Sequence, residues 1–214
     1  MGIFSKYYRS VKYPKNGNNK LIIHTSKGTK INPRFVKKIT VCFNGKNSVL
    51  EIFEPEKLAG SKFILCDGDN FTIKNSQGNI FVVGGHESIL FIDENCTLQN
   101  TCFFLNDEKG IYIRIGKDCM FSVDISIWSS DTHKICDAKT GKLINAAKKG
   151  IDIGNHVWCG TRCTILKETT IKDNTVIGAS SVVKGQFDES NIVIAGNPAR
   201  KIKRGIIWKR EGVS

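Results

Sequence analysis

Four histidines, His24, His86, His133 and His156, are the side chains of this 214-residue sequence best suited to moving a proton near neutral pH. An imidazole with a pKa near 6.5 is partly neutral at pH 7, so it can accept a proton from a hydroxyl group that is about to act as a nucleophile. Proton abstraction of this kind accelerates a reaction by roughly 10² to 10⁴. The surrounding sequence must decide which histidine is placed to do so.

The sequence contains eight cysteines but no Cys-x-x-Cys pair. Because the first residues, MGIFSKYYRS, hold no hydrophobic export signal, we expect the reducing cytoplasm and buried thiols rather than disulfides. His156, Cys159 and Cys163 have the spacing of a partial metal site. The repeat described next explains both cysteines as inward-facing residues, so we expect no metal.

A six-residue repeat organises the second half of the sequence. From Ile153 the chain reads IGNHVW, CGTRCT, ILKETT, IKDNTV, IGASSV and VKGQFD, so each hexad opens with an aliphatic residue or Cys. The fifth residues of the first five hexads are small or β-branched. This period fits a coil of three short parallel strands, in which three hexads close one turn and the first-position side chains fill a narrow interior. Ile153 would then stack under Ile171, and Cys159 under Ile177.

The same phase occurs upstream at Ile115, Phe121 and Ile127. Ile115 and Ile153 are 38 residues apart, which is not a multiple of six, so an insertion must interrupt the coils. The polar stretch 129–150, SSDTHKICDAKTGKLINAAKKG, lacks the hexad pattern and is predicted to be this inserted loop. Long loops on a regular scaffold often carry function, which favours the histidine within it, His133.

The other segments are less regular. Residues 41–112 are β-rich, and Ile92 lies 23 residues before Ile115, which predicts wider, irregular coils, with an independent β-sandwich as the alternative. Residues 113–198 are expected to form the regular hexapeptide coils. In the basic tail, residues 199–214, Ile202, Ile206 and Ile207 have helical spacing, which favours a short C-terminal helix.

Positive charge is concentrated at the N-terminus. The net charge is +12, and residues 1–40 hold ten Lys or Arg and no Asp or Glu. Such a segment could attract an acidic polysaccharide, a membrane surface or nucleic acid, or it could be a solvated arm or a face covered by a neighbouring subunit. We expect no nucleic acid, because no aromatic-interleaved binding motif accompanies the charge. No run of about 18 apolar residues occurs, so no transmembrane segment is expected.

The second half of the sequence resembles a known family. SSDTH, Ile144-Asn145, IGNHVWCG, ILK, IGASSVV and AGNPARKIK occur in the order typical of hexapeptide-repeat acyltransferases, in particular the O-acetyltransferases of bacterial capsular and other surface polysaccharides. The likeness covers about residues 113–208. Three positions depart from the commoner forms of the family: Cys159 replaces Ile, Glu168 replaces the Gly after ILK, and Ser180 replaces the Gly of IGAGS.

The resemblance implies an all-β chain folded as a left-handed parallel β-helix. It also implies a homotrimer with active sites between subunits, and acetyl-CoA as the acetyl donor. The implied activity is O-acetylation of a sugar hydroxyl of a bacterial surface polysaccharide, such as a capsule or an O-antigen. The alternatives are an acetyltransferase that acts on a small sugar or an amine, and a non-catalytic β-helix that binds polyanions.

By the same resemblance, His133 would be the general base. Asp131 would orient or polarise its imidazole or cap a turn, and Asn145 would donate a hydrogen bond to the acceptor or occupy a turn. Trp158 matches an aromatic residue near the thioester end of CoA, so we count it as both catalytic and coenzyme-binding. The remaining coenzyme contacts are expected at Gly160, whose region would supply an oxyanion donor, and at Thr161, Gly178, Ala179, Ser180, Lys184, Arg200, Lys201, Lys203 and Arg204.

Overall fold

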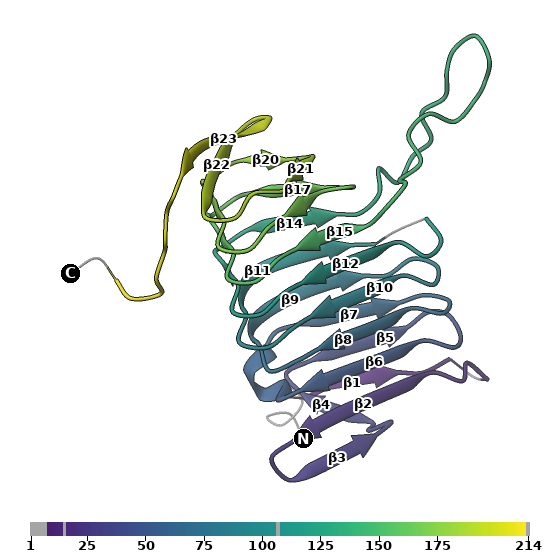
Figure 1. Cartoon of the computed structure of the whole chain (residues 1–214). Coiled ribbons are helices and arrows are strands. Elements are labelled where there is room, and N and C mark those ends of the chain that lie inside the picture. The colour runs from purple at the N-terminus through teal and green to yellow at the C-terminus, as the bar shows by residue number, and fades with distance from the viewer. Residues whose placement is uncertain (1–7, 15, 106–107, 213–214) are drawn as a thin grey trace.

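A computed structural model of the chain describes residues 8–14, 16–105 and 108–212. The chain winds as a stack of coils, with the strands of successive coils lying side by side (Figure 1). Within the described residues the strands form a nine-stranded sheet and a branched sheet of fourteen, and the single helical element is the 3-10 turn η1 (Pro55–Leu58). No helix in this part of the chain is long and apolar enough to cross a bilayer.

Three faces of the stack follow from the pairing. Face one, the nine-stranded sheet, contains β2 (Lys20–Thr25), β3 (Gly28–Ile31), β6 (Val49–Phe53), β8 (Asn70–Ile73), β10 (Ile89–Ile92), β12 (Tyr112–Ile115), β15 (Ile151–Ile153), β18 (Thr170–Ile171) and β21 (Gln186–Phe187). The other sheet begins with β1 (Tyr8–Lys12), β4 (Phe35–Lys37), β5 (Thr40–Phe43), β7 (Lys62–Leu65), β9 (Gln77–Val83) and β11 (Thr97–Phe104).

After β11 this second sheet divides into two faces. Face two contains β13 (Met120–Phe121), β16 (Trp158–Cys159), β19 (Val176–Ile177), β22 (Ile192–Gly196) and β23 (Ala199–Arg204). Face three contains β14 (Ile125–Trp128), β17 (Thr164–Leu166) and β20 (Val182–Val183). Each regular coil therefore visits the three faces in turn, as three hexads require.

The hexad repeat predicted from Ile153 onward is confirmed. Every first-position side chain from Ile153 to Val183 is at most 3% exposed, and the fifth-position side chains are fully buried. Ile153 pairs with Ile171, and Cys159 with Ile177, as expected for coils of 18 residues. The interior is a column of aliphatic and small side chains, which leaves the outward positions free to contact ligands.

The coils upstream are wider but continue the same stack. Ile73 pairs in parallel with Ile92, and Ile92 with Ile115, which are steps of 19 and 23 residues. Parallel pairing of this kind excludes a separate antiparallel sandwich. Large aromatic side chains fill the wider interior, and four of them are fully buried: Phe63, Phe71, Phe103 and Phe121.

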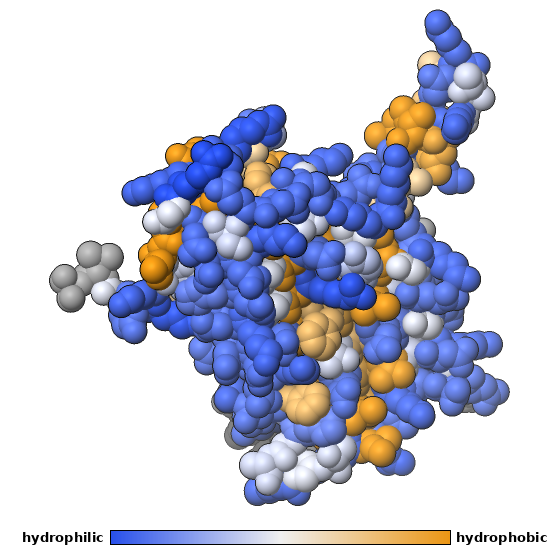
Figure 2. All heavy atoms as spheres, in the orientation of Figure 1, coloured by the Kyte–Doolittle hydropathy of each residue, from blue (hydrophilic) through white to orange (hydrophobic). Residues whose placement is uncertain are grey.

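The interruption between Ile115 and Ile153 is a long hairpin, which we call the arm (residues 129–150). Ile115 and Ile153 pair directly, so the 38 residues between them are 20 more than one regular turn needs. A bridge between Cys136 and Leu143 joins the two halves of the hairpin. Figure 1 shows the arm pointing away from the coils, and Figure 2 shows apolar side chains along it, where Ile135 and Ile144 are 54% and 62% exposed.

The prediction of a C-terminal helix is wrong. Residues Ala199–Arg204 form β23, which pairs antiparallel with β22, and the chain then runs without helix along the side of the coils. Ile202 and Ile207 are largely exposed, so the helically spaced isoleucines have no apolar surface to cover. Pairing with β22 instead satisfies backbone groups at the edge of the last coil.

The basic N-terminal segment is not a free arm over its described residues. β1 pairs in parallel with β5, and β2 with β6, so these strands form the first coil. β3 and β4 fold back antiparallel on β2 and β1. The segment presents exposed lysines at this end of the stack: Lys20, Lys27, Lys30, Lys37 and Lys38.

The cysteines follow the expectation only in part. The thiols of the coil interior are buried, at Cys96, Cys119, Cys159 and Cys163, but Cys136 is exposed on the arm and Cys42, Cys66 and Cys102 are partly covered. No disulfide links the described cysteines. The hexad pattern explains this division, because Cys136 belongs to the one segment that lacks it.

Candidate functional site

The base of the arm is tied to the coil below by one lysine. Lys167 follows β17, which lies next to β14, the strand from which the arm leaves. Its side chain is 5% exposed. The Lys167 ammonium donates to Asp131 Oδ2 (2.6 Å) on the outgoing half of the arm and to the Asn145 carbonyl on the returning half. A single buried cation therefore joins both halves.

The Asn145 side chain continues this network into the arm. Its amide nitrogen donates to Asp131 Oδ2 (3.0 Å) and to the carbonyl of His133 (2.8 Å), and its oxygen accepts from the N–H of Ile135 (2.8 Å). The side-chain amide is thus used within the arm, and it fixes the backbone of His133. The predicted contact of Asn145 with an acceptor would have to replace one of these bonds.

Asp131 contacts His133 through the backbone. The Asp131 carbonyl accepts the N–H of His133 (2.7 Å), while among the described residues no hydrogen bond joins the Asp131 carboxylate to the imidazole. The hydrogen bond from Lys167 lowers the pKa of Asp131, aided by the Asn145 amide and the nearby charge of Lys184. Asp131 is therefore ionised at neutral pH and acts here on the arm rather than on the ring.

A cavity of about 330 Å³ opens beside His133. The His133 side chain is exposed at its wall. Glu108 supports the opposite side, since its carboxylate accepts the hydroxyl of Ser130 (3.1 Å) and the N–H of Ala147 (2.7 Å). The full lining is Glu108, Lys109, Ser130, Thr132, His133, Lys134, Leu143, Asn145 and Ala146. A small polar ligand such as a sugar residue fits a space of this size.

The other predicted residues lie around Trp158 on face two. Trp158 is 36% exposed. The corner that follows it is closely packed, because a Cβ on Gly160 would lie 2.7 Å from the Ala179 nitrogen and one on Gly178 would lie 2.8 Å from the Ala195 Cβ. These two glycines are required by the stacking of the coils themselves.

Gly160 does not offer its amide to a ligand in this structure. Its N–H donates to the Ile177 carbonyl (2.8 Å), as does that of Gly178 to Ile194 (2.8 Å). To act as an oxyanion donor, the Gly160 amide would have to give up this bond. The exposed residues at this corner are Ala179 and Ser180, while the hydroxyl of Thr161 donates to the Val123 carbonyl (2.8 Å).

The predicted phosphate ligands divide into three groups. Lys201 and Arg204 both bind Glu189, and the hydrogen bond from Lys201 contributes most to lowering the pKa of that carboxyl. Arg200 and Lys203, on the same strand, form no ion pair with a described carboxylate. Lys184 lies instead near the arm, where its charge acts on Asp131.

A C-terminal strap, residues 206–210, supports Trp158 from the side. The buried ring of Trp208 stacks on His156 with centroids 4.0 Å apart and lies 6.0 Å from the Trp158 centroid. The indole N–H of Trp208 donates to the His156 carbonyl (2.8 Å). His156 Nδ1 faces Asp118 Oδ2 (2.6 Å), and Nε2 faces the Trp208 carbonyl (3.1 Å). Both ring nitrogens thus have partners within the fold.

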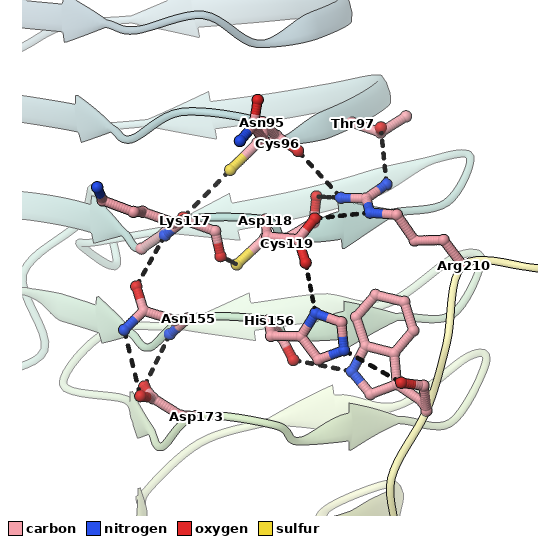
Figure 3. Close-up of polar contacts among 12 residues, drawn as sticks. Asn95, Cys96, Thr97, Lys117, Asp118, Cys119, Asn155, His156, Asp173 and Arg210 are labelled. Atoms are coloured by element: carbon pink, nitrogen blue, oxygen red, sulfur yellow. Dashed lines mark hydrogen bonds and ion pairs between the residues drawn. The ribbon is translucent and has the colours of Figure 1, made fainter.

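Arg210 anchors the end of the strap. Its guanidinium donates to Asp118 Oδ1 (2.7 Å) and to the carbonyls of Asn95 and Cys119 (both 3.0 Å). Figure 3 shows Asp118 held between His156 and Arg210. Burial alone would raise the pKa of Asp118, but the hydrogen bonds from these two residues outweigh it and lower the pKa. His156 is therefore part of this anchor, while the side chains of Cys159 and Cys163 are buried in the coil interior.

The structure does not bring His133 and Trp158 together within one chain. The Trp158 corner, with Thr161, lies at one end of a face-three strand, and the arm lies at the other end, near Lys167. Six residues of extended chain span about 20 Å. The predicted site residues thus form two half-sites, one at the arm and one beside Trp158.

Sequence reasoning missed Lys167, Glu108, Trp208 and Arg210. Lys167 is the third residue of its hexad, and the third residues of other hexads, such as Asn155 and Ala179, are exposed, so the hexad pattern did not predict its burial. The contacts of Glu108 and Arg210 join residues up to 115 positions apart, and no local pattern encodes them.

The chain is similar in sequence to known O-acetyltransferases. No family model matches the chain. Over 137 residues it is 34% identical to a polysialic acid O-acetyltransferase of Escherichia coli O1:K1, a match that covers 64% of this chain and 43% of that protein. Over 104 residues it is 46% identical to the polysialic acid O-acetyltransferase of Neisseria meningitidis, covering 49% and 47%. The chain thus spans less than half the length of these relatives.

Two crystal structures have the same fold over most of the chain. They are those of the polySia specific acetyltransferase NeuO (TM-score 0.78, 29% identity, 96% of this chain and 84% of that chain) and of the polysialic acid O-acetyltransferase OatWY (TM-score 0.76, 27% identity, 96% and 92%). The coverage of this chain shows that the likeness includes the irregular coils upstream of the hexads.

Proposed function

Because the chain belongs to the hexapeptide-repeat acetyltransferase family, we propose that it transfers the acetyl group of acetyl-CoA to a hydroxyl of an acidic polysaccharide. The observation that carries the proposal is the position of His133: an exposed imidazole beside a cavity, on an arm whose base is fixed by buried contacts. An anchored histidine next to a sugar-sized space is suited to general-base catalysis.

His133 would take the proton of the acceptor hydroxyl as its oxygen forms a bond to the acetyl carbonyl carbon. The carbon–sulfur bond of the thioester then breaks, and the imidazolium returns the proton to the departing CoA sulfur. Asp131 and Asn145 would hold the backbone of His133 during these steps. The oxyanion would need a donor in the region of Gly160, and the Gly160 N–H itself would have to leave the Ile177 carbonyl to serve.

The half-site around Trp158 is suited to CoA. Trp158 presents an exposed ring for the thioester end, and Ala179 and Ser180 offer a small, exposed edge along which pantetheine can run. Among the cations on β23, Arg200 and Lys203 are free of carboxylates in the described part of the chain and are the best candidates for the phosphates. Lys201 would have to leave Glu189 to take part.

The complete active site would lie between subunits of a homotrimer of left-handed β-helices. Its two halves occupy opposite ends of face three, so the arm of one subunit could meet Trp158 of the next. The exposed apolar residues of the arm, Ile135, Leu143 and Ile144, are then available to pack on the neighbouring coils. Trimer formation would thus both complete the active site and bury the apolar surface of the arm.

The acceptor would be an acidic surface polysaccharide of the polysialic acid type. Both relatives are named for polysialic acid, and the ten basic residues of the first forty complement such a polymer. The exposed lysines of the N-terminal strands would raise the concentration of acceptor near the enzyme. A neutral sugar would gain nothing from them.

Thiol release from acetyl-CoA tests the proposal, with oligosialic acid and a neutral galactoside as acceptors. We expect release with oligosialic acid, and a loss of more than 100-fold in kcat for His133→Ala without a change in melting temperature. His24→Ala is the control and should keep its kcat, since His24 lies on β2 in the first coil, where it contacts Thr29 and Glu51. Retention of more than about a tenth of the activity by His133→Ala would exclude the general-base role. Tight binding of oligosialic acid without thiol release would favour a non-catalytic scaffold.

A further inference from the structure

We propose that Lys167 is a positioning residue, whose buried ammonium holds the arm in the geometry that His133 needs; this inference rests on the proposed function. Lys167 touches neither the His133 ring nor the cavity beside it. It acts through Asp131 and Asn145, the two residues that bond to the backbone of His133.

The burial of Lys167 indicates a role beyond solubility. Lysine is among the residues least often buried, because removing its charge from water is costly unless partners compensate. Here the side chain is 5% exposed and its ammonium meets a carboxylate and a carbonyl. The third residues of other hexads, such as Asn155 and Ala179, are exposed, so Lys167 is exceptional in being buried, and its ammonium contacts both halves of the arm.

Those partners lie on opposite halves of the arm. Asp131 is two residues before His133, and Asn145 is on the returning half, so the ammonium closes the hairpin at its root. The Asn145 side chain then bonds to the His133 carbonyl (2.8 Å). Further contacts tie the root of the arm to the coils, among them those of Glu108 with Ser130 and Ala147 and of Glu168 with Lys148, but none of these reaches His133.

The same ammonium sets the charge near the imidazole. It neutralises Asp131, which would otherwise leave an unpaired carboxylate two residues from His133. An unpaired negative charge favours the imidazolium. A higher pH is then needed to form the neutral imidazole that can act as a base. The other charged groups at this end of the molecule are Glu108, Lys109 and Lys134 on the cavity wall and Lys184 near Asp131. Of these, Glu108 also contacts both halves of the arm, through Ser130 and Ala147, but these hydrogen bonds reach neither Asp131 nor Asn145.

The decisive experiment compares Lys167→Met, Lys167→Arg and Lys149→Met. Lys167→Met should lower kcat by about 10- to 100-fold with the KM for acetyl-CoA within about twofold, since a misplacement near 1 Å has such an effect. The acid limb of the pH–rate profile should move to higher pH, and Lys167→Arg should return it. Lys149→Met is the matched control: its ammonium bonds only to Thr170 and Gln186, so kcat and the limb should stay unchanged.

Asp131→Asn separates positioning from misfolding, because it breaks the same contact without altering the coil interior. It should also lower kcat, but it should not move the acid limb upward, since it removes the negative charge. Amide hydrogen exchange over residues 131–147 should accelerate in Lys167→Met and Asp131→Asn, while the exchange of β15 and β17 stays slow. This readout needs no acceptor.

Three results would overturn the inference. They are a normal kcat and pH profile in Lys167→Met, unchanged exchange in the arm, or loss of Lys167→Met to global unfolding together with a normal Asp131→Asn enzyme. An inactive His133→Ala with a normal Lys167→Met would refute this inference alone, whereas an active His133→Ala would refute the proposed function.

Discussion

Trp158 owes its orientation to residues far along the chain. Trp208 packs beside it, and Trp208 is itself held by a stack on His156 and a hydrogen bond to the His156 carbonyl. A partly exposed indole with one side fixed offers its other side to a ligand without a large loss of side-chain entropy. In the proposed site, the strap would thus hold the ring ready for contact with CoA.

Trp158→Ala should lower kcat/KM for acetyl-CoA by about tenfold, which corresponds to the loss of about 1.4 kcal/mol of aromatic contact. The fold should remain, because Trp158 is outside the coil interior. Steady-state kinetics and titration of CoA by calorimetry measure the effect. Phe91→Ala, which removes a half-exposed aromatic residue from face one, is the control. Unchanged kinetics in Trp158→Ala would remove this residue from the site.

At the residue scale, sequence reasoning located exposed groups better than their partners. His133 was identifiable because it stands in the one stretch that breaks the hexads. Its supports were not, since the contact between Asp131 and Lys167 depends on which strand of the next coil lies beside β14. Gly160 was assigned to a ligand, whereas its small size and its amide both serve coil stacking.

At the scale of the elements, the corners between strands use left-handed backbone. Asp118, His156, Asn174 and Asn191 have positive φ angles, and Asn and Asp tolerate that conformation better than most residues. Ser180 adopts φ 59° at a corner where the related pattern has glycine. For a residue with a Cβ, this conformation costs about 1–2 kcal/mol.

Ser180→Gly should therefore stabilise the protein. Relief of the backbone strain at this corner outweighs the conformational entropy that glycine adds to the unfolded chain. We therefore expect the free energy of unfolding to rise by about 0.5–1 kcal/mol, or Tm by about 2 °C. The neighbouring Ser181→Gly is the control and should destabilise, because the buried Ser181 hydroxyl donates to Gly178 O (2.6 Å) and accepts from Gly196 N (3.1 Å). Calorimetric scans compare the two variants. A lower Tm for Ser180→Gly would show that the serine makes a contact of its own.

Elements with a repeat were predictable, and those without one were not. The hexads fix side-chain parity, so the inward residues follow from any one of them. The C-terminal isoleucines suggested a helix because spacing alone does not show whether an apolar surface is available. The backbone of β22 offered a partner instead, and the segment became a strand.

At the scale of the whole molecule, the separation of the two half-sites would make activity a property of the proposed trimer. His133→Ala should be nearly inactive alone, and Trp158→Ala should retain about a tenth of the wild-type kcat/KM. When the two are co-expressed, subunits would combine at random, and about one site in four would unite an intact His133 with an intact Trp158 from a neighbour. We therefore expect about a quarter of wild-type activity.

Two different affinity tags isolate the mixed assemblies, and light scattering gives their mass, which should be that of a trimer. Variants carrying both substitutions on one chain, co-expressed with the wild type, calibrate the measurement. Mixed assemblies whose activity does not exceed the mean of the two parent variants would place the whole site within one chain and would contradict the proposed interface.

Both ends of the stack carry the same sign of charge. β23 closes one end with Arg200, Lys201, Lys203 and Arg204, and the strands of the N-terminal segment close the other with exposed lysines. A rod of stacked coils can in principle grow into a fibre by joining end to end, as open sheet edges invite. Here each join would place cations against cations, and this repulsion opposes end-to-end association. A long polyanion that bridges the two ends would neutralise the repulsion.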